Sequence, residues 1–253
     1  TPLAFTLALA LPEARTEWLE PFSQGLLALA DTHGCELIGG DTTRGPLNIC
    51  ITVLGEVPTG RALLRSGARP GDDIYVGGTL GDASLALQCL LGKTALPDGM
   101  LARARERLEQ PTPRVALGLA LRGIATAAAD VSDGLLGDLG HILTQSQVGA
   151  TIDTGIAITL IAACAYSTGA TGQFGLNIPE ATRLQCVLAG GDDYELVFTA
   201  PAHRRAAVVA AAEASATPVT RLGRIEAAVG LRLVDGQGQP VANTFASFDH
   251  FST

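Results

Sequence analysis

Residues 127–136 read AAADVSDGLL, a stretch that joins an apolar run to the start of an apolar helical pattern. The run predicts a buried strand over 127–131, and the pattern after it predicts a helix over 134–145. If Asp130 ends the strand and Ser132 caps the helix, Asp130 and Asp133 lie at a helix N-terminus, where free backbone N–H groups favour an anion. A metal ion and a phosphate could share such a turn. Taken alone, the stretch is explained equally well if Asp133 is only a capping acid and Asp130 only a turn former.

The chain on either side alternates strands and helices without a regular order. We expect strands over 3–11, 48–57, 73–76, 149–153, 194–199, 222–225 and 231–234, and helices over 18–32, 82–91, 100–109, 114–125 and 201–214. Several strand pairs are separated by too little chain for a parallel crossover. The sequence therefore predicts a mixed α+β architecture rather than a doubly wound sheet. Pro58-Thr59-Gly60 ends regular structure and is the predicted junction between two domains, 1–58 and 59–253.

The composition excludes several classes of protein. The 253 residues include 17 Lys and Arg against 25 Asp and Glu, and the basic residues form no cluster that could line a nucleic-acid groove. No apolar stretch approaches the roughly 20 residues that a membrane span needs. Five cysteines, an odd number without close pairs, are interpreted as reduced core residues of a cytosolic protein. We therefore expect no nucleic-acid partner, no membrane span and a cytoplasmic location.

Acidic clusters flanked by glycine recur along the chain. They read GGDTTRG at 39–45, GGTLGD at 77–82, DVSDG at 130–134 and GGDDYE at 190–195. Each is expected where a strand ends, because glycine lets the backbone approach a ligand and a neighbouring carboxylate can hold a hard cation. Individually, a surface turn is favoured for the first cluster, and a strand–helix junction with Asp82 as N-cap for the second. Arg65 is either a phosphate clamp or an ordinary surface arginine.

Together with LLRSGA at 63–68 and FDHF at 248–251, these clusters resemble the thiamine-monophosphate kinase family in order and separation along nearly the whole chain. The resemblance implies the two-domain fold that this family shares with aminoimidazole ribonucleotide synthetase and selenophosphate synthetase. In that fold an N-terminal α/β domain pairs across a homodimer and is followed by a C-terminal α/β domain. Residues 1–58 would then be the remainder of the nucleotide-binding, metal-binding and dimerisation domain, and 59–253 the C-terminal domain.

The resemblance also implies a reaction and a set of contacts. ATP would phosphorylate thiamine monophosphate to thiamine diphosphate with several Mg²⁺ ions, the last step in making that cofactor. The matched positions provide three kinds of contact. They are nucleotide contacts at Gly40, Asp41, Arg65 and Ser132, metal ligands at Asp41, Asp130 and Asp133, and thiamine-phosphate contacts at Asp192 and Phe248.

Two features depart from the family pattern. Asp192 stands where the family usually has Glu, which shortens the side chain by one methylene group. The chain also begins at Thr1, after the point where the family carries a Ser-Thr-Asp motif and a Ser-Asp motif that bind metal. We interpret this start as a truncation rather than as degeneration, because the other motifs are intact.

The expected chemistry needs no side-chain nucleophile and no general base. Phosphoryl transfer depends mostly on in-line positioning and charge neutralisation, and an acceptor phosphate with a second pKa of about 6 is already ionised near neutral pH. Two other functions stay open. The chain could be another ATP-dependent enzyme of the same superfamily, acting on an amide, selenide or carbamoyl substrate, or a non-catalytic nucleotide-binding or dimerising module.

Overall fold

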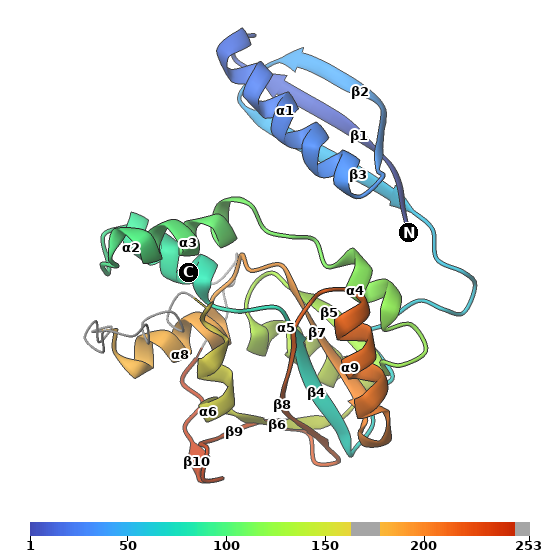
Figure 1. The fold of residues 1–253 in the computed structure, drawn as a ribbon, viewed down its shortest axis with the longest axis vertical. Coiled ribbons are helices and arrows are strands. Elements are labelled where there is room, and N and C mark those ends of the chain that lie inside the picture. Colours follow the sequence, from blue (N-terminus) through green and yellow to red (C-terminus); the bar gives the residue numbers. More distant parts are fainter. Residues whose placement is uncertain (163–177, 246–253) are drawn as a thin grey trace. The chain divides into compact units, whose positions relative to one another are not determined.

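The computed structural model describes residues 1–162 and 178–245. The chain divides into two compact units, Thr1–Ala62 and Leu63–Thr253. The first unit is a three-stranded sheet with one helix, and the second is a seven-stranded sheet with helices on both faces (Figure 1). Within the described ranges, no helix is both long and apolar enough to cross a membrane.

The first unit begins with a strand–helix–strand crossover. It contains β1 (Pro2–Leu11), α1 (Thr16–Thr32), β2 (Glu36–Arg44) and β3 (Asn48–Gly55), in the sheet order β2-β1-β3. β2 runs parallel to β1, as the crossover requires, and β3 runs antiparallel to it. Leu9 of β1 and Phe22 of α1 line the same hollow, so α1 covers one face of the sheet.

Residues 39–44 of the first glycine cluster lie within β2 and do not form the turn expected from their glycines. Gly39 and Gly40 have φ angles of 154° and 148°, values that favour glycine. A side chain at Gly40 would collide with the backbone of Leu7 on β1, and the register of the two strands shifts close by. The glycines thus allow two strands to approach at an irregularity, whereas the low strand propensity of Gly and Asp had indicated a turn.

The second unit is built on a mostly antiparallel sheet with the order β10-β9-β6-β8-β4-β7-β5. Among the strands that the structure describes, β6 and β9 are the one parallel pair of neighbours in this sheet. This confirms the mixed α+β architecture. The described strands and α-helices of this unit are β4 (Asp72–Gly77), α2 (Asp82–Leu90), α3 (Asp98–Glu109), α4 (Val115–Ala120), β5 (Ala127–Val131), α5 (Leu135–Ser146), β6 (Gly149–Asp153), α6 (Thr154–Ala157), α8 (Glu180–Ala189), β7 (Glu195–Pro201), α9 (Arg205–Ala214), β8 (Val219–Glu226), β9 (Gly230–Val234) and β10 (Pro240–Val241).

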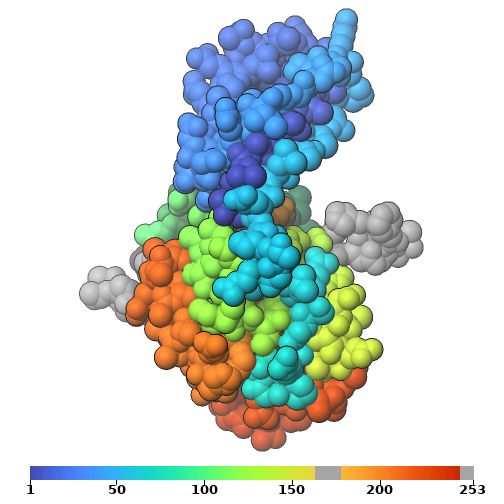
Figure 2. Space-filling model, turned by 90° about the vertical axis from the view of Figure 1, so that its right-hand side faces the viewer, coloured from blue at the N-terminus to red at the C-terminus, as the bar shows by residue number. Residues whose placement is uncertain are grey.

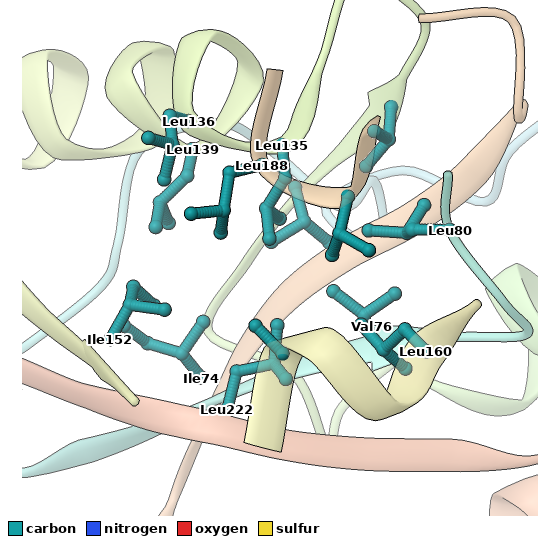
Figure 3. Packing of buried hydrophobic residues seen from close by; sticks show 14 of the residues in the cluster. Ile74, Val76, Leu80, Leu135, Leu136, Leu139, Ile152, Leu160, Leu188 and Leu222 are labelled. Carbon is teal, nitrogen blue, oxygen red and sulfur yellow. The ribbon is translucent and has the colours of Figure 1, made fainter. Parts of the chain in front are cut away.

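Successive side chains of β4 point to opposite faces of the sheet and enter two separate cores. Ile74 and Val76 join the larger core with Leu135 and Leu139 of α5 (Figure 3). Tyr75 belongs to a second cluster, whose helical members come from α4 and α9, and its ring stacks on Phe198 of β7 at a centroid distance of 5.2 Å. The second unit is therefore a three-layer structure with the sheet in the middle.

Two of the four glycine clusters, 77–82 and 130–134, lead into helices, but the caps expected there are wrong. The N-cap of α2 is Gly81 rather than Asp82, which is the first helical residue and is buried. The N-cap of α5 is Gly134 rather than Ser132. In neither case does the N-cap residue supply a side-chain cap, since both positions are glycine.

The expectation that the cysteines are core residues is wrong for most of those described. Cys186 is buried, Cys89 and Cys35 are partly buried, and Cys50 on β3 is exposed. These four are free thiols, and Cys164 lies outside the described residues.

Candidate functional site

The turn between β5 and α5 carries the central acidic residues. Asp130 and Asp133 are both exposed, and Ser132 between them is partly buried. The buried carboxylate of Asp138, in the first turn of α5, accepts hydrogen bonds from the backbone N–H groups of Ser132 at 3.0 Å and Asp133 at 3.2 Å. Asp138 therefore holds the turn from inside and leaves the carboxylates of Asp130 and Asp133 facing solvent.

The 190–195 loop lies directly against this turn. The N–H group of Asp192 donates to the carbonyl of Ser132 at 2.9 Å, and that of Tyr194 donates to the carbonyl of Val131 at 3.0 Å. Asp192 and Tyr194 have positive φ angles of 69° and 52°. Such conformations cost non-glycine residues about 1–3 kcal/mol each and persist where surrounding contacts hold them. The two acidic clusters, which are far apart in the sequence, therefore form one site.

The electrostatics of the site are those of closely spaced carboxylates. Burial raises the pKa of Asp138, and the charges of Asp130 and Asp133 raise it further, against the two backbone hydrogen bonds. Burial also raises the pKa of the Tyr194 hydroxyl, and the negative charges of Asp192, Asp133 and Asp130 raise this pKa further. Burial is the larger cause of both shifts, and the added effect of the Asp130 and Asp133 charges shows that these carboxylates lie close enough together for a cation to stabilise them.

Arg65 reaches this region from the segment before β4. Its Nη2 atom lies 3.9 Å from Oδ1 of Asp130, and because both side chains are half exposed the pair is weak. The segment is fixed by the N–H group of Ala128, which donates to the carbonyl of Leu64 at 2.9 Å, and by the Ser146 hydroxyl, which donates to the carbonyl of Arg65 at 3.3 Å. It runs over the surface of the second unit, cyan in Figure 2. Because its pair with Asp130 is weak and its side chain is half exposed, the guanidinium group of Arg65 can turn toward a ligand.

A shallow hollow of about 330 Å³ adjoins Arg65. Leu64, Arg65 and Ser66 line it on one side, and His141 and Gln145 of α5 line it on the other. The hollow lies between the Arg65 segment and the helix that follows the acidic turn, so a ligand there would reach both.

The remaining predicted site residues lie elsewhere. Gly40 and Asp41 belong to the first unit, where both are exposed on β2. Phe248 lies outside the described residues. Over 1–162 and 178–245, no group of three or more His, Cys, Asp or Glu side chains is arranged to hold a metal ion. The structure therefore brings together Arg65, the 130–133 turn and Asp192.

Sequence reasoning gave no role to several buried charged residues around the site. Asp138 holds the turn, and Asp193 and Glu195, both fully buried, anchor the neighbouring loop. The sequence signal for Asp138 was available, since a lone acid on the apolar face of a predicted helix must find a partner. Arg107 and Arg114, which bind Glu195, had no signal of this kind because their pairing depends on tertiary structure.

Comparisons with known proteins agree with this architecture. A family model for the N-terminal domain of AIR synthase related proteins matches residues 1–57, and one for the C-terminal domain matches residues 69–236. The thiamine-monophosphate kinase of Salmonella typhimurium is 42% identical over 254 residues, an alignment that spans 100% of this chain and 74% of that protein. The Escherichia coli enzyme is 40% identical over 253 residues, with the same coverage.

Solved structures of thiamine-monophosphate kinases are also similar to this chain. The crystal structure of thiamine-monophosphate kinase from Stenotrophomonas maltophilia is 46% identical, with a TM-score of 0.81 over 95% of this chain and 73% of that one. AaThiL complexed with AMPPCP and TMP is 26% identical, with a TM-score of 0.74 over 99% of this chain and 74% of that one. The hydrogenase maturation protein HypE of E. coli, at 18% identity and a TM-score of 0.72 over 99% of this chain and 75% of that one, shares the fold. From these matches, the chain belongs to the thiamine-monophosphate kinase family of AIR synthase related proteins.

Proposed function

We propose that this protein transfers the γ-phosphoryl group of ATP to thiamine monophosphate, giving thiamine diphosphate and ADP. The observation that carries the proposal is the match over the whole chain to a thiamine-monophosphate kinase at 42% identity. The complex of AaThiL with AMPPCP, an analogue of ATP, and TMP supports the choice of both substrates. These relatives favour the kinase over another reaction of the superfamily and over a non-catalytic module.

The donor set of the acidic turn suits Mg²⁺, which takes oxygen ligands and is held by one or two carboxylates together with substrate phosphates. Asp130 and Asp133 are exposed. Burial is the main reason that the pKa of Asp138 is raised, and the charges of these two residues raise it further. We assign these two residues as metal ligands in the second unit, and Asp41 as a ligand in the first. Bound Mg²⁺ would neutralise negative charge on the phosphates during transfer.

The chain's own residues bind and orient the substrates. Arg65 presents a planar guanidinium group that suits a nucleotide phosphate, and Ser132 is assigned as a second nucleotide contact in this unit. Gly40 is assigned as a nucleotide contact in the first unit. Asp192 is held beside the turn and offers a carboxylate to thiamine monophosphate, whose thiazolium ring is a cation. Phe248, outside the described residues, is assigned as an aromatic contact to the thiamine.

The transfer is direct and in line. The acceptor is a phosphate that is already ionised near neutral pH, since its second pKa is about 6, so it can attack without help from a base. The contribution of the protein is then to align the two phosphates and to offset their charge.

We further propose that the protein is a cytoplasmic homodimer that pairs through its first unit. Free cysteines, including the exposed Cys50, suit a reducing compartment. β3 is exposed along its whole length, and large exposed apolar patches mark interaction surfaces. The exposed large apolar residues of this unit are Leu3, Leu27, Leu29, Leu37, Ile38, Leu47, Ile49, Ile51, Val53, Leu54 and Val57.

Turnover of the Asp130→Ala variant tests the function and the metal assignment. In the full-length protein with ATP, Mg²⁺ and thiamine monophosphate, we expect the wild type to form thiamine diphosphate and Asp130→Ala to form almost none. Glu213→Ala, which removes an exposed carboxylate on α9, serves as the control and should retain wild-type turnover. Unchanged turnover in Asp130→Ala would contradict the metal assignment.

A calorimetric titration with ATP and Mg²⁺ separates the alternatives. Binding of nucleotide without formation of thiamine diphosphate would support a non-catalytic module. Binding together with hydrolysis of ATP but no thiamine product would support a different substrate within the same superfamily.

A further inference from the structure

The carboxylate of Asp193 caps a helix that is distant in the sequence. Asp193 is fully buried, and its Oδ2 and Oδ1 atoms accept hydrogen bonds from the N–H groups of Gly81 at 2.6 Å and Ala83 at 3.2 Å. These donors lie at the N-terminus of α2, where the N-cap is a glycine and offers no side chain. Asp193 therefore supplies the cap that the helix's own sequence lacks.

A second anchor follows two residues later. The fully buried carboxylate of Glu195 accepts hydrogen bonds from Nη2 of Arg107 at 2.6 Å and from Nε and Nη2 of Arg114 at 2.6 and 2.7 Å. Nη2 of Arg107 also donates to the carbonyl of Asp193 at 3.0 Å. A side chain at Gly78 would collide with the Glu195 carboxylate, so this glycine leaves the space that the ion pair occupies.

These contacts hold the 190–195 loop between two parts of the second unit. On one side, Asp193 binds α2 and Arg107 comes from α3, two helices that lie together. On the other side, the N–H groups of Asp192 and Tyr194 bind the turn after β5. The residues on either side of Asp193 are those with positive φ, so the buried anchor keeps them in conformations that they rarely adopt alone.

We propose that Asp193 is a positioning residue for the acceptor substrate: by fixing the loop to the α2 N-terminus, it sets the place of Asp192 beside the Asp130–Asp133 turn. The proposal rests on the proposed function, in which Asp192 contacts thiamine monophosphate. Asp193 itself touches no substrate, because its carboxylate is buried and occupied by α2.

The kinetic test compares Asp193→Ala, Asp193→Asn and Asp73→Ala in the full-length protein. Asp73 is a matched control because it is also a buried carboxylate, bound to Arg205 at 2.6 Å and Arg221 at 3.1 Å, on β4. Displacing a substrate contact by about 1 Å can cost on the order of 100-fold. We expect Asp193→Ala to raise KM for thiamine monophosphate roughly 10- to 100-fold, with KM for ATP changed much less. Asp193→Asn, which keeps one acceptor oxygen, should recover most of the loss.

A double-mutant cycle decides whether Asp193 acts through Asp192. Once Asp192→Ala is in place, adding Asp193→Ala should not raise KM for thiamine monophosphate further. Additive effects would overturn the proposal, as would an equal rise of both KM values in Asp193→Ala or the same rise in Asp73→Ala. If Asp193→Ala does not fold, the cycle is run with Asp193→Ser, whose hydroxyl is one bond shorter than the carboxylate and should keep a measurable loss.

Hydrogen–deuterium exchange separates this proposal from the proposed function. If the wild type does not phosphorylate thiamine monophosphate, the function fails, and the loop can still be followed by exchange of its backbone amides. We expect Asp193→Ala to increase exchange both at 81–83 and at 192–194, and Asp73→Ala to change neither segment. Unchanged exchange at 192–194 in Asp193→Ala would overturn the positioning role.

Discussion

Asp192 and Asp193 are adjacent carboxylates with opposite surroundings. Asp192 is partly exposed beside the acidic turn, whereas Asp193 is buried under the α2 N-terminus. Burial raises the pKa of Asp193 to about 7 from an ordinary value of 3.8, against the hydrogen bonds from Gly81 and Ala83. The charge of Asp82 raises this pKa as well, and Arg107 lowers it.

The raised pKa predicts a pH dependence of stability. Between about pH 4 and 7 the folded protein holds the Asp193 proton that the unfolded chain has released, so the contribution of Asp193 is complete below pH 4 and is lost as the pH rises through 7. Relative to Asp193→Asn, the free energy of unfolding of the wild type should therefore fall across this range, by at most about 1.4 kcal/mol per pH unit. Urea denaturation of both proteins at a series of pH values measures this difference in the free energy of unfolding. Parallel curves for the two proteins would show that Asp193 does not titrate there.

The sequence predicts contacts between neighbouring residues better than contacts between distant ones. Asp130, Ser132 and Asp133 share a turn because they are consecutive, and the strand–helix pattern around them was sufficient to place that turn. Ser132 as a cap was wrong because Gly134 intervenes and Asp138 binds the backbone instead. The burial of Asp193 could not be derived, since it depends on where α2 ends up relative to β7.

At the scale of elements, α3 carries two ion pairs that differ mainly in burial. Glu195 is fully buried between Arg107 and Arg114, whose side chains are 17% exposed, whereas Arg105 and Glu109 form an i,i+4 pair whose side chains are 46% and 45% exposed. Removing one partner of a buried pair leaves an uncompensated charge, but an exposed pair is worth little. The two pairs on α3 therefore allow the contribution of a buried ion pair to stability to be compared with that of an exposed one.

We expect Glu195→Gln to lower the free energy of unfolding by about 3–5 kcal/mol, because two guanidinium groups lose their counter-charge. Glu109→Gln should lower it by only about 0.3–0.5 kcal/mol. Guanidinium chloride would screen both pairs, so the measurement should use urea denaturation monitored by circular dichroism. Similar losses in the two variants would mean that the Glu195 pair does not contribute as a buried pair.

Most strands and helices were predictable. The strands and α-helices missed within the described residues are β2, α6, α8 and β10, and the two longest of them, β2 and α8, share a cause. β2 contains Gly39, Gly40 and Asp41, residues that are rare in strands, and its extended form depends on pairing with β1. α8 follows a segment rich in Gly and Thr, and its amphipathic pattern is short. In both cases tertiary contacts override weak local preferences.

At the scale of the whole molecule, the first unit has more apolar surface than one helix covers. If this surface pairs two copies of the chain, Ile51→Glu on β3 should produce a monomer, because it places a charge on an apolar interface. Val229→Glu, at a position that is 73% exposed in the second unit, is the control and should leave the dimer intact. Sedimentation velocity measures the oligomeric state of both variants and of the wild type. A wild type that sediments as a monomer would refute the dimer, and dimeric Ile51→Glu would place the interface elsewhere.

The long-range cap on α2 also has a consequence for the order of folding. Residue 193 follows Gly81 by 112 positions, so α2 is synthesised long before the carboxylate that caps it. Contacts at such separations carry a large loop-closure entropy and form late. We expect the Gly81 amide to gain protection in pulse-labelled refolding together with β7, after the middle of α5. The helix that holds the substrate loop is then completed only when that loop is in place, so a partly folded chain cannot present a finished site.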